Sequence, residues 1–142
     1  MITKMIKVDP VHPDLEELRE AGAILDNGGL VAFPTETVYG LGGDALNPVS
    51  SGKIYAAKGR PSDNPLIVHV LDMEHLEAIV EEVPEKARIL AKAYCPGPLT
   101  MIFRINDRVP YETTGGLDSV AVRIPDHPVA RALIASCGGY IA

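Results

Sequence analysis

The stretch 31–43, VAFPTETVYGLGG, places hydroxyl groups directly after a short apolar run. Residues 30–33 have the length and composition of a buried strand, which Pro34 ends. Hydroxyl side chains follow at alternate positions, at Thr35, Thr37 and Tyr39. Glycines at 40, 42 and 43 allow backbone conformations that other residues avoid. A loop of this kind at the end of a buried strand is typical of a binding site for a small polar ligand.

A second polar stretch carries cations and leads directly into another apolar run. Lys58, Arg60 and Asn64 lie in the segment KGRPSDNP, and the run LIVHV that follows has the pattern of a buried strand. The two cations come after a predicted helix over 48–57. They could form a local basic site, or they could simply complement the dipole at the end of that helix.

The predicted strand 119–124 alternates strictly between two kinds of side chain. Residues two apart on a strand point to the same face, so Ser119 and Arg123 share one face with Ala121 between them. The opposite face carries only valine and isoleucine, and we expect it to be core. From the sequence alone, Arg123 is either a ligand-binding guanidinium or an ordinary exposed arginine.

Two more polar side chains fall within apolar strands. His69 lies in the predicted strand 66–71, which is apolar on both faces, and Thr100 opposes the apolar set of the predicted strand 99–105. His69 could contact a ligand, or it could be a core histidine whose hydrogen bonds are satisfied. The hydroxyls of Thr35 and Thr37 could likewise serve only to form a turn.

Three blocks occur in a fixed order: PTETVYGLG at 34–42, KGRP at 58–61 and NPLIVH at 64–69. In residues and spacing these blocks resemble the YrdC-like family, and within it most closely the L-threonylcarbamoyladenylate synthases. The resemblance covers essentially the whole chain. It implies the YrdC-like fold and an enzyme, a nucleotidyltransferase that acts in tRNA modification.

The resemblance also implies roles for the residues named above. The residues that would contact L-threonine are Thr37, His69 and Arg123, with Arg123 holding its carboxylate by two hydrogen bonds. The residues that would contact ATP are Lys58, Arg60, Asn64 and Ser119. Of these, the two cations Lys58 and Arg60 would carry catalysis. Further candidates for lining the pocket are Thr35, Tyr39 and Thr100.

The reaction implied by the resemblance joins L-threonine, bicarbonate and ATP into threonylcarbamoyl-AMP and pyrophosphate. A partner complex then moves the threonylcarbamoyl group to tRNA. A carbamate carboxylate attacks the α-phosphate, so cations must offset the repulsion between two anions, and Lys58, Arg60 and Arg123 can do so. No serine or cysteine stands in a nucleophile motif, which favours catalysis by positioning and charge stabilisation.

No metal site of the protein's own is expected. The four histidines are scattered without zinc spacing, and no cluster of acidic residues has the spacing of a dedicated cation site. We expect Mg²⁺ to accompany ATP, and we expect no tightly bound cofactor.

Composition narrows the class of protein. The chain has 142 residues, of which 46% are hydrophobic and 23% charged, enough for one domain with a sizeable core. The net charge of −6 argues against general binding of polyanions. Two cysteines are too few for a disulfide framework, so free thiols are expected. Without a long apolar run or a signal peptide, we expect a cytoplasmic protein that does not bind membranes.

The remaining pattern predicts helices and strands that mix without strict alternation. Strands are expected at 1–8, 30–33, 66–71, 99–105 and 119–124. Helices are expected from 15 to a stop at 27–29, and at 48–57, 73–82, 85–94 and 129–136. Connections without regular structure are expected at 34–43, 106–108 and 113–116. This mixture predicts an α/β domain with a twisted sheet of parallel and antiparallel strands, flanked by helices.

The last three residues, 140–142, look like the opening of one more strand. We therefore expect a single YrdC-like domain over 1–142 that is incomplete at its C-terminal end. The family domain continues with a small-residue loop that forms part of the nucleotide and amino-acid site. The chain by itself is accordingly expected to be weakly active or inactive.

Two other functions remain open at this stage. One is a non-catalytic module of the same fold that binds double-stranded RNA or tRNA. The acidic total and the few aromatic residues count against it. The other is a carbamoyl-transfer domain like that of hydrogenase maturation proteins, which would be accompanied by zinc-finger-like and acylphosphatase-like domains that this sequence does not contain.

Overall fold

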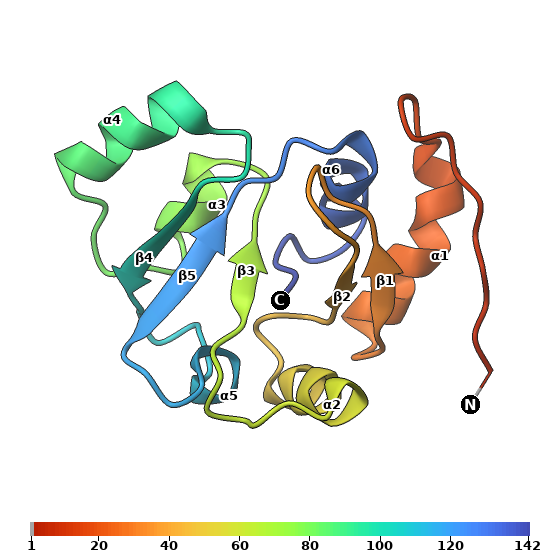
Figure 1. Cartoon of the computed structure of the whole chain (residues 1–142), viewed down its shortest axis with the longest axis horizontal. Coiled ribbons are helices and arrows are strands. Elements are labelled where there is room, and N and C mark those ends of the chain that lie inside the picture. Colours follow the sequence, from red (N-terminus) through yellow and green to blue (C-terminus); the bar gives the residue numbers. More distant parts are fainter. Residues whose placement is uncertain (1) are drawn as a thin grey trace.

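The computed structural model describes residues 2–142 as a mixed α/β fold (Figure 1). The helices are α1 (Leu15–Asp26), α2 (Pro48–Lys58), α3 (Met73–Glu77), α4 (Glu85–Tyr94), α5 (Tyr111–Thr114) and α6 (Pro128–Ala135). The strands are β1 (Val31–Phe33), β2 (Gly40–Gly42), β3 (Ile67–His69), β4 (Thr100–Arg104) and β5 (Ser119–Arg123). The mixture of helices and strands agrees with the predicted fold class.

Local sequence explains where the longer helices begin. Asp14 caps α1 by accepting a hydrogen bond from the backbone N–H of Glu16, and Asn47 caps α2 in the same way through Val49. Pro48 then occupies the first turn of α2, where no hydrogen-bond donor is needed. Both starts, and the extent of α4, agree with the prediction.

A three-stranded sheet in the order β3-β5-β4 forms the centre of the molecule (Figure 1). β3 and β5 run parallel, whereas β4 and β5 run antiparallel, so the sheet is mixed as predicted. One face is core, where Val68, Val120 and Val122 are buried with the side chains of α3. The other face is open, because Ile67 is 41% exposed and Ile102 is 71% exposed.

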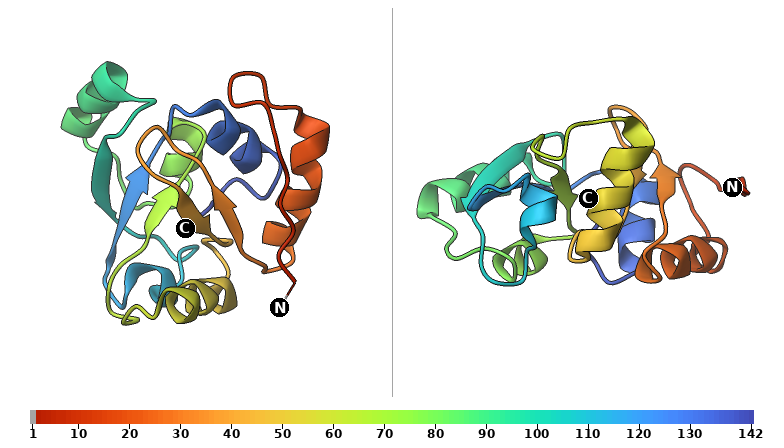
Figure 2. Two further views of the ribbon diagram at one scale, coloured as in Figure 1. Left: turned by 45° about the vertical axis from the view of Figure 1, so that its right-hand side comes forward. Right: turned by 90° about the horizontal axis from the view of Figure 1, so that it is seen from below.

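A two-stranded hairpin, β1-β2, lies beside this sheet and carries the hydroxyl loop at its tip (Figure 1). Residues 140–142 lie between the hairpin and β3, where the C-terminus is marked in the left view of Figure 2. Ile141 exchanges two backbone hydrogen bonds with His69, at 2.7 and 3.2 Å, and Ala142 exchanges two with Gly43, at 3.0 and 3.1 Å. These three residues therefore join the two sheets.

Gly42 makes this junction possible. A Cβ atom added at Gly42 would lie 2.5 Å from Cγ2 of Ile141 and 2.8 Å from the ring of Phe33. The hairpin was predicted as a loop throughout 34–43, and this prediction is wrong for β2. The glycines allow close packing between the hairpin and residues 140–142. The local sequence pattern cannot reveal this contact, because the two segments are far apart in the chain.

Three further predictions differ from the structure. Residues 2–8 form no strand, and Met1 lies outside the described residues; Ile6 and Val8 pack instead against the apolar cluster between α1 and α6. α3 ends at Glu77 rather than near residue 82, because Val80 leaves the helix to pair with Ile105. Residues 111–114 are helical, although a loop was expected over 113–116.

None of the helices formed by residues 2–142 has the length and apolar composition needed to cross a bilayer. Cys95 and Cys137 are both free thiols, as predicted.

Candidate functional site

Strand register places three polar side chains in one row on the open face of the central sheet. Arg123 is paired with His69 on the parallel neighbour β3 and with Thr100 on the antiparallel neighbour β4. Residues directly opposite each other on adjacent strands point to the same face, with Cβ atoms about 5 Å apart. The row brings together His69, Thr100 and Arg123, which lie 31 and 23 positions apart along the sequence.

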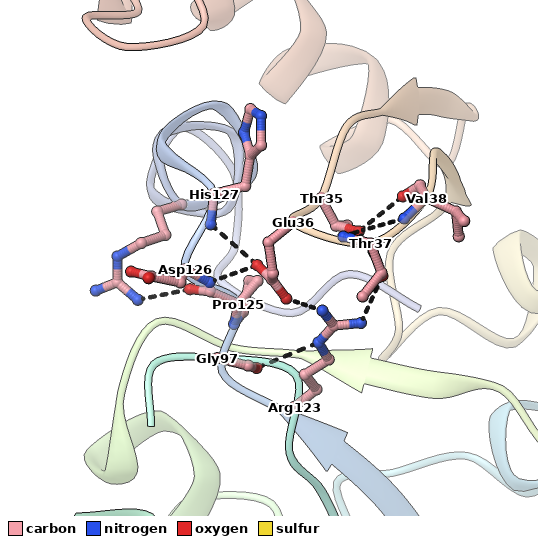
Figure 3. A network of polar contacts seen from close by, with 10 residues as sticks. Thr35, Glu36, Thr37, Val38, Gly97, Arg123, Pro125, Asp126 and His127 are labelled. Carbon is pink, nitrogen blue, oxygen red and sulfur yellow. Dashed lines mark hydrogen bonds and ion pairs between the residues drawn. The ribbon is translucent and has the colours of Figure 1, made fainter. Parts of the chain in front are cut away.

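The hairpin adds a fourth polar side chain to this row. In the loop between β1 and β2, Oγ1 of Thr35 accepts hydrogen bonds from the backbone N–H groups of Thr37 and Val38, both at 3.2 Å, and donates to the carbonyl of Val38 at 2.7 Å. This turn directs Thr37 toward Arg123, and Oγ1 of Thr37 accepts a hydrogen bond from Nη1 of Arg123 at 3.3 Å (Figure 3). Thr35 is thus a turn former, and Thr37 is the hydroxyl presented to the row.

Arg123 is held on three sides (Figure 3). Its Nε donates to the carbonyl of Gly97 at 3.3 Å, its Nη1 donates to Thr37, and its Nη2 forms an ion pair with Oε1 of Glu36. Burial lowers the pKa of the Arg123 guanidinium from its ordinary value, although an arginine remains charged in a protein. The arrangement is a fixed, partly dehydrated cation that can bind a carboxylate.

Glu36 also contacts the start of α6. Its Oε2 accepts hydrogen bonds from the backbone N–H groups of Asp126, at 2.8 Å, and His127, at 3.1 Å (Figure 3). Neither Glu36 nor the carbonyl of Gly97 was identified as a site residue from the sequence. The only local signal is the position of Glu36 between two hydroxyl residues, because its partners lie about ninety residues further along the chain.

His69 is largely buried in this row, and its Nδ1 makes no hydrogen bond within the described residues. Its ring lies edge-on to Phe33, with the ring centroids 5.8 Å apart. Burial lowers the pKa of His69 below its usual value of 6.5. The imidazole is therefore neutral near pH 7, and it can serve as a hydrogen-bond donor and acceptor for a ligand.

The lowered pKa of His69 predicts a loss of stability in acid. The unfolded chain binds a proton at His69 near pH 6.5 and the folded chain does not, so the free energy of unfolding should fall as the pH drops below about 6.5, by at most about 1.4 kcal/mol per pH unit. Above that pH the effect should vanish. Urea unfolding between pH 5 and 8 should show that the difference between the wild type and His69→Gln shrinks in acid.

His12→Gln provides the matched control for this measurement, since His12 is exposed. A parallel stability profile for the wild type and the His69→Gln variant would contradict the burial of a neutral imidazole at this position.

The remaining predicted residues lie near the other end of the same strands. Lys58 is the last residue of α2, and the loop that follows carries Arg60 and Asn64 to the start of β3, at the lower edge of the sheet in Figure 1. Ser119 begins β5 and lies four positions from Arg123, which is about 13 Å along a strand. Because β3 and β5 are parallel, the loop with Arg60 and Asn64 and the start of β5 at Ser119 both lie at the end of the strands opposite His69 and Arg123.

The helix α5 supports the loop with Arg60 and Asn64. Gly115 follows α5 with a positive φ of 64°, and a Cβ atom there would lie 2.8 Å from the carbonyl oxygen of Asp63. The buried hydroxyl of Thr113 donates to the carbonyl of Ala45 at 2.7 Å and contacts the hydroxyl of Ser51 at 2.8 Å. The loop with Arg60 and Asn64 thus packs on a rigid support, while the side chains of Lys58, Arg60 and Asn64 are exposed.

Two further observations concern Tyr39 and the possible binding of a metal ion. Tyr39 is 77% exposed at the end of the hydroxyl loop. Among residues 2–142, no three histidine, cysteine, aspartate or glutamate side chains come together as they would to hold a metal ion.

Comparison with known proteins accounts for this arrangement. The family model for Sua5, YciO and YrdC proteins, described as "Telomere recombination", matches residues 23–142. The chain belongs to this family. The match includes the hydroxyl loop, the loop with Lys58 and Arg60, and the strand with Arg123.

Three relatives of this Sua5/YciO/YrdC chain are closely similar. The threonylcarbamoyl-AMP synthase of Pyrococcus abyssi is 52% identical over 126 residues, which cover 87% of this chain and 37% of the relative. The enzyme of the same name from Bacillus subtilis is 51% identical over 135 residues, which cover 94% and 39%. A crystal structure of P. abyssi Sua5 complexed with L-threonine has a TM-score of 0.90 and 48% identity, and covers 92% of this chain and 38% of that one. The chain thus spans less than half the length of these three relatives.

Proposed function

We propose that this chain supplies residues of the amino-acid and nucleotide site of an L-threonylcarbamoyladenylate synthase. Such an enzyme forms threonylcarbamoyl-AMP and pyrophosphate from L-threonine, bicarbonate and ATP. The observation that carries the proposal is the row of His69, Arg123 and Thr100 on the open face of the sheet. Thr37 joins this row by accepting a hydrogen bond from Arg123. The similarity to two enzymes named threonylcarbamoyl-AMP synthase supports it.

In this proposal the row binds L-threonine. Arg123 holds the carboxylate, because a planar guanidinium offers parallel N–H groups that match its two oxygens. The hydroxyl of Thr37 and the neutral imidazole of His69 are available to the polar groups of the same amino acid. That a related Sua5 protein has been crystallised with L-threonine supports this choice of substrate.

The residues at the opposite end of the strands bind ATP. Arg60, Asn64 and Ser119 contact the nucleotide, and Lys58 offsets the charge of the phosphates. The separation of about 13 Å between Ser119 and Arg123 leaves room for an amino acid followed by a triphosphate on one face. The amino group of L-threonine and bicarbonate form a carbamate with loss of water. The carboxylate of this carbamate then attacks the α-phosphate, and pyrophosphate leaves.

The protein promotes this step by charge and position. Two anions must approach each other, so Lys58 and Arg60 lower the barrier by neutralising the phosphates as charge develops. We also propose that Mg²⁺ arrives bound to the triphosphate, that the product passes to a complex that modifies tRNA, and that the reaction takes place in the cytoplasm.

Removing either cation should slow the reaction. We expect Lys58→Ala and Arg60→Ala each to reduce threonine- and bicarbonate-dependent release of pyrophosphate at least tenfold, which corresponds to about 1.4 kcal/mol. The reason is that each exposed cation is free of any ion pair within residues 2–142, so its charge is available to the phosphates. The assay should use the full-length protein.

Two exposed cations elsewhere provide matched controls, namely Lys86→Ala on α4 and Arg19→Ala on α1. Both controls should keep the wild-type rate. Normal rates for both Lys58→Ala and Arg60→Ala would refute the assignment of the nucleotide site. A wild-type protein that releases no pyrophosphate in response to threonine would refute the function.

A further inference from the structure

Glu36 joins three separate parts of the chain at the proposed amino-acid site. It lies in the loop between β1 and β2, it pairs with Arg123 at the end of β5, and it accepts two backbone hydrogen bonds at the start of α6 (Figure 3). We infer that Glu36 is a positioning residue, which holds the Arg123 guanidinium in the orientation that binds the carboxylate of the amino-acid substrate. The inference rests on the proposed function.

The number of hydrogen-bond donors on Arg123 supports this role. A guanidinium carries five N–H groups. Two of them donate to Gly97 and Thr37, and Nη2 forms the ion pair with Glu36 but makes no hydrogen bond within residues 2–142. Even with one N–H of Nη2 directed toward Glu36, two N–H groups remain, which is the number that a carboxylate needs for a two-point grip. Glu36 can therefore keep its contact while the substrate carboxylate binds, so it acts as a support for the arginine.

Only a carboxylate can make all the contacts of Glu36. Oε2 accepts from two backbone N–H groups, while Oε1 forms the ion pair with Nη2 of the guanidinium, so an oxygen is needed at both ends of the group. Glutamine has the same shape, but its amide end is a donor. In Glu36→Gln, either the contact with Arg123 or the contact with α6 would place a donor against a donor.

The environment makes this pair more than a surface ion pair. The side chains of Arg123 and Glu36 are only 11% and 23% exposed. Little water can reach such positions, so water does not replace the contact with Arg123 when Glu36 is lost. The arginine is then free to adopt other orientations. The backbone donors of Asp126 and His127 fix the far end of Glu36, and the arginine is aligned by an anchored group.

Electrostatics alone makes the opposite prediction, which allows a sharp test. If only charge mattered, removal of the Glu36 charge would leave Arg123 more attractive to an anion, and the substrate would bind more tightly. If orientation matters, the substrate should bind more weakly. The two views differ in the sign of the change in KM for L-threonine.

The test compares Glu36→Gln with Glu82→Gln in the full-length protein. Glu82 is exposed, so its variant makes the same change of charge away from the site. From pyrophosphate release we expect Glu36→Gln to raise KM for L-threonine at least tenfold while KM for ATP stays within twofold. The ATP value also reports that the variant is folded. Glu82→Gln should match the wild type in both constants.

A second readout isolates recognition of the carboxylate. Calorimetric titration with L-threonine and with L-threoninamide, which lacks the carboxylate, should show a strong preference for L-threonine in the wild type. Glu36→Gln should lose at least three quarters of that preference. A general disturbance of the fold would weaken both ligands equally and leave the ratio unchanged.

Several results would overturn the inference. These are a KM for L-threonine that is unchanged or lower in Glu36→Gln, equal rises in the two KM values, and an unchanged preference over L-threoninamide. Should the variant fail to fold, an NMR measurement on the wild type decides. We expect the guanidinium N–H signals of Arg123 to exchange slowly with water before L-threonine is added, and fast exchange would overturn the inference. A wild type without threonine-dependent activity would refute the proposed function itself, whereas an active wild type with an equally active Glu36→Gln would refute only this inference.

Discussion

Replacing Arg123 with alanine should reduce threonine-dependent release of pyrophosphate by roughly 100-fold or more, which corresponds to about 2.7 kcal/mol of transition-state stabilisation. Under the proposed function, the variant loses the charged fork that would hold the substrate carboxylate. It also leaves Glu36 without its cation in a site where little water can take its place. The measurement is kcat/KM for L-threonine in the full-length protein.

Arg123→Lys tests whether the fork, rather than the charge, is what matters. Lysine keeps the charge but cannot offer parallel donors, so we expect it to recover only a small part of the lost activity. Arg19→Ala, on the exposed surface of α1, is the control and should behave as the wild type. An Arg123→Ala variant within threefold of the wild-type kcat/KM would show that the carboxylate binds elsewhere.

Replacing Ile141 with alanine should destabilise the fold by about 2–5 kcal/mol, the usual cost of truncating a large core side chain. Ile141 is fully buried, and it packs against Gly42 and Phe33 in the apolar cluster of α1 and α6. The cavity left by the truncation would lie where the two sheets meet. Urea unfolding of the wild type and the variant measures the difference in the free energy of unfolding.

Ile89→Ala is the matched control, because Ile89 lies on α4 with 59% of its surface exposed. Its effect should stay within about 0.5 kcal/mol, as is usual for surface substitutions. A loss of less than about 1 kcal/mol for Ile141→Ala would mean that the terminal segment adds little to the junction of the two sheets.

Local signals in the sequence were sufficient for the longer elements. Asp14, Asn47 and Pro48 mark helix starts by chemistry that acts within one turn, and the alternation over 119–124 assigns Arg123 to the open face. The hydrogen bonds that define β2 could not be predicted, because Gly-Leu-Gly pairs with β1 for reasons of packing against Ile141. The same holds for α3, which ends early to let Val80 pair with Ile105.

The residues of the candidate site could be proposed from the sequence, but their arrangement could not. The resemblance to the family implied roles for Thr37, His69 and Arg123, and the family membership of the chain agrees with that resemblance, whereas the roles of these residues stay predictions. Their alignment in one row depends on the register of three strands, which is set by contacts between distant segments. Glu36 was missed for the same reason, since its importance comes entirely from partners at the other end of the chain.

The position of residues 140–142 has a consequence for biosynthesis. The hydroxyl loop belongs to the hairpin and Arg123 belongs to the central sheet, and the segment between them is the last of the described residues to leave the ribosome. A nascent chain that lacks residues 140–142 cannot yet make the backbone hydrogen bonds by which this segment links Gly43 and His69. Such long-range closure is slow compared with the formation of helices. The hairpin and the central sheet should therefore remain unlinked in nascent chains that end before residue 140.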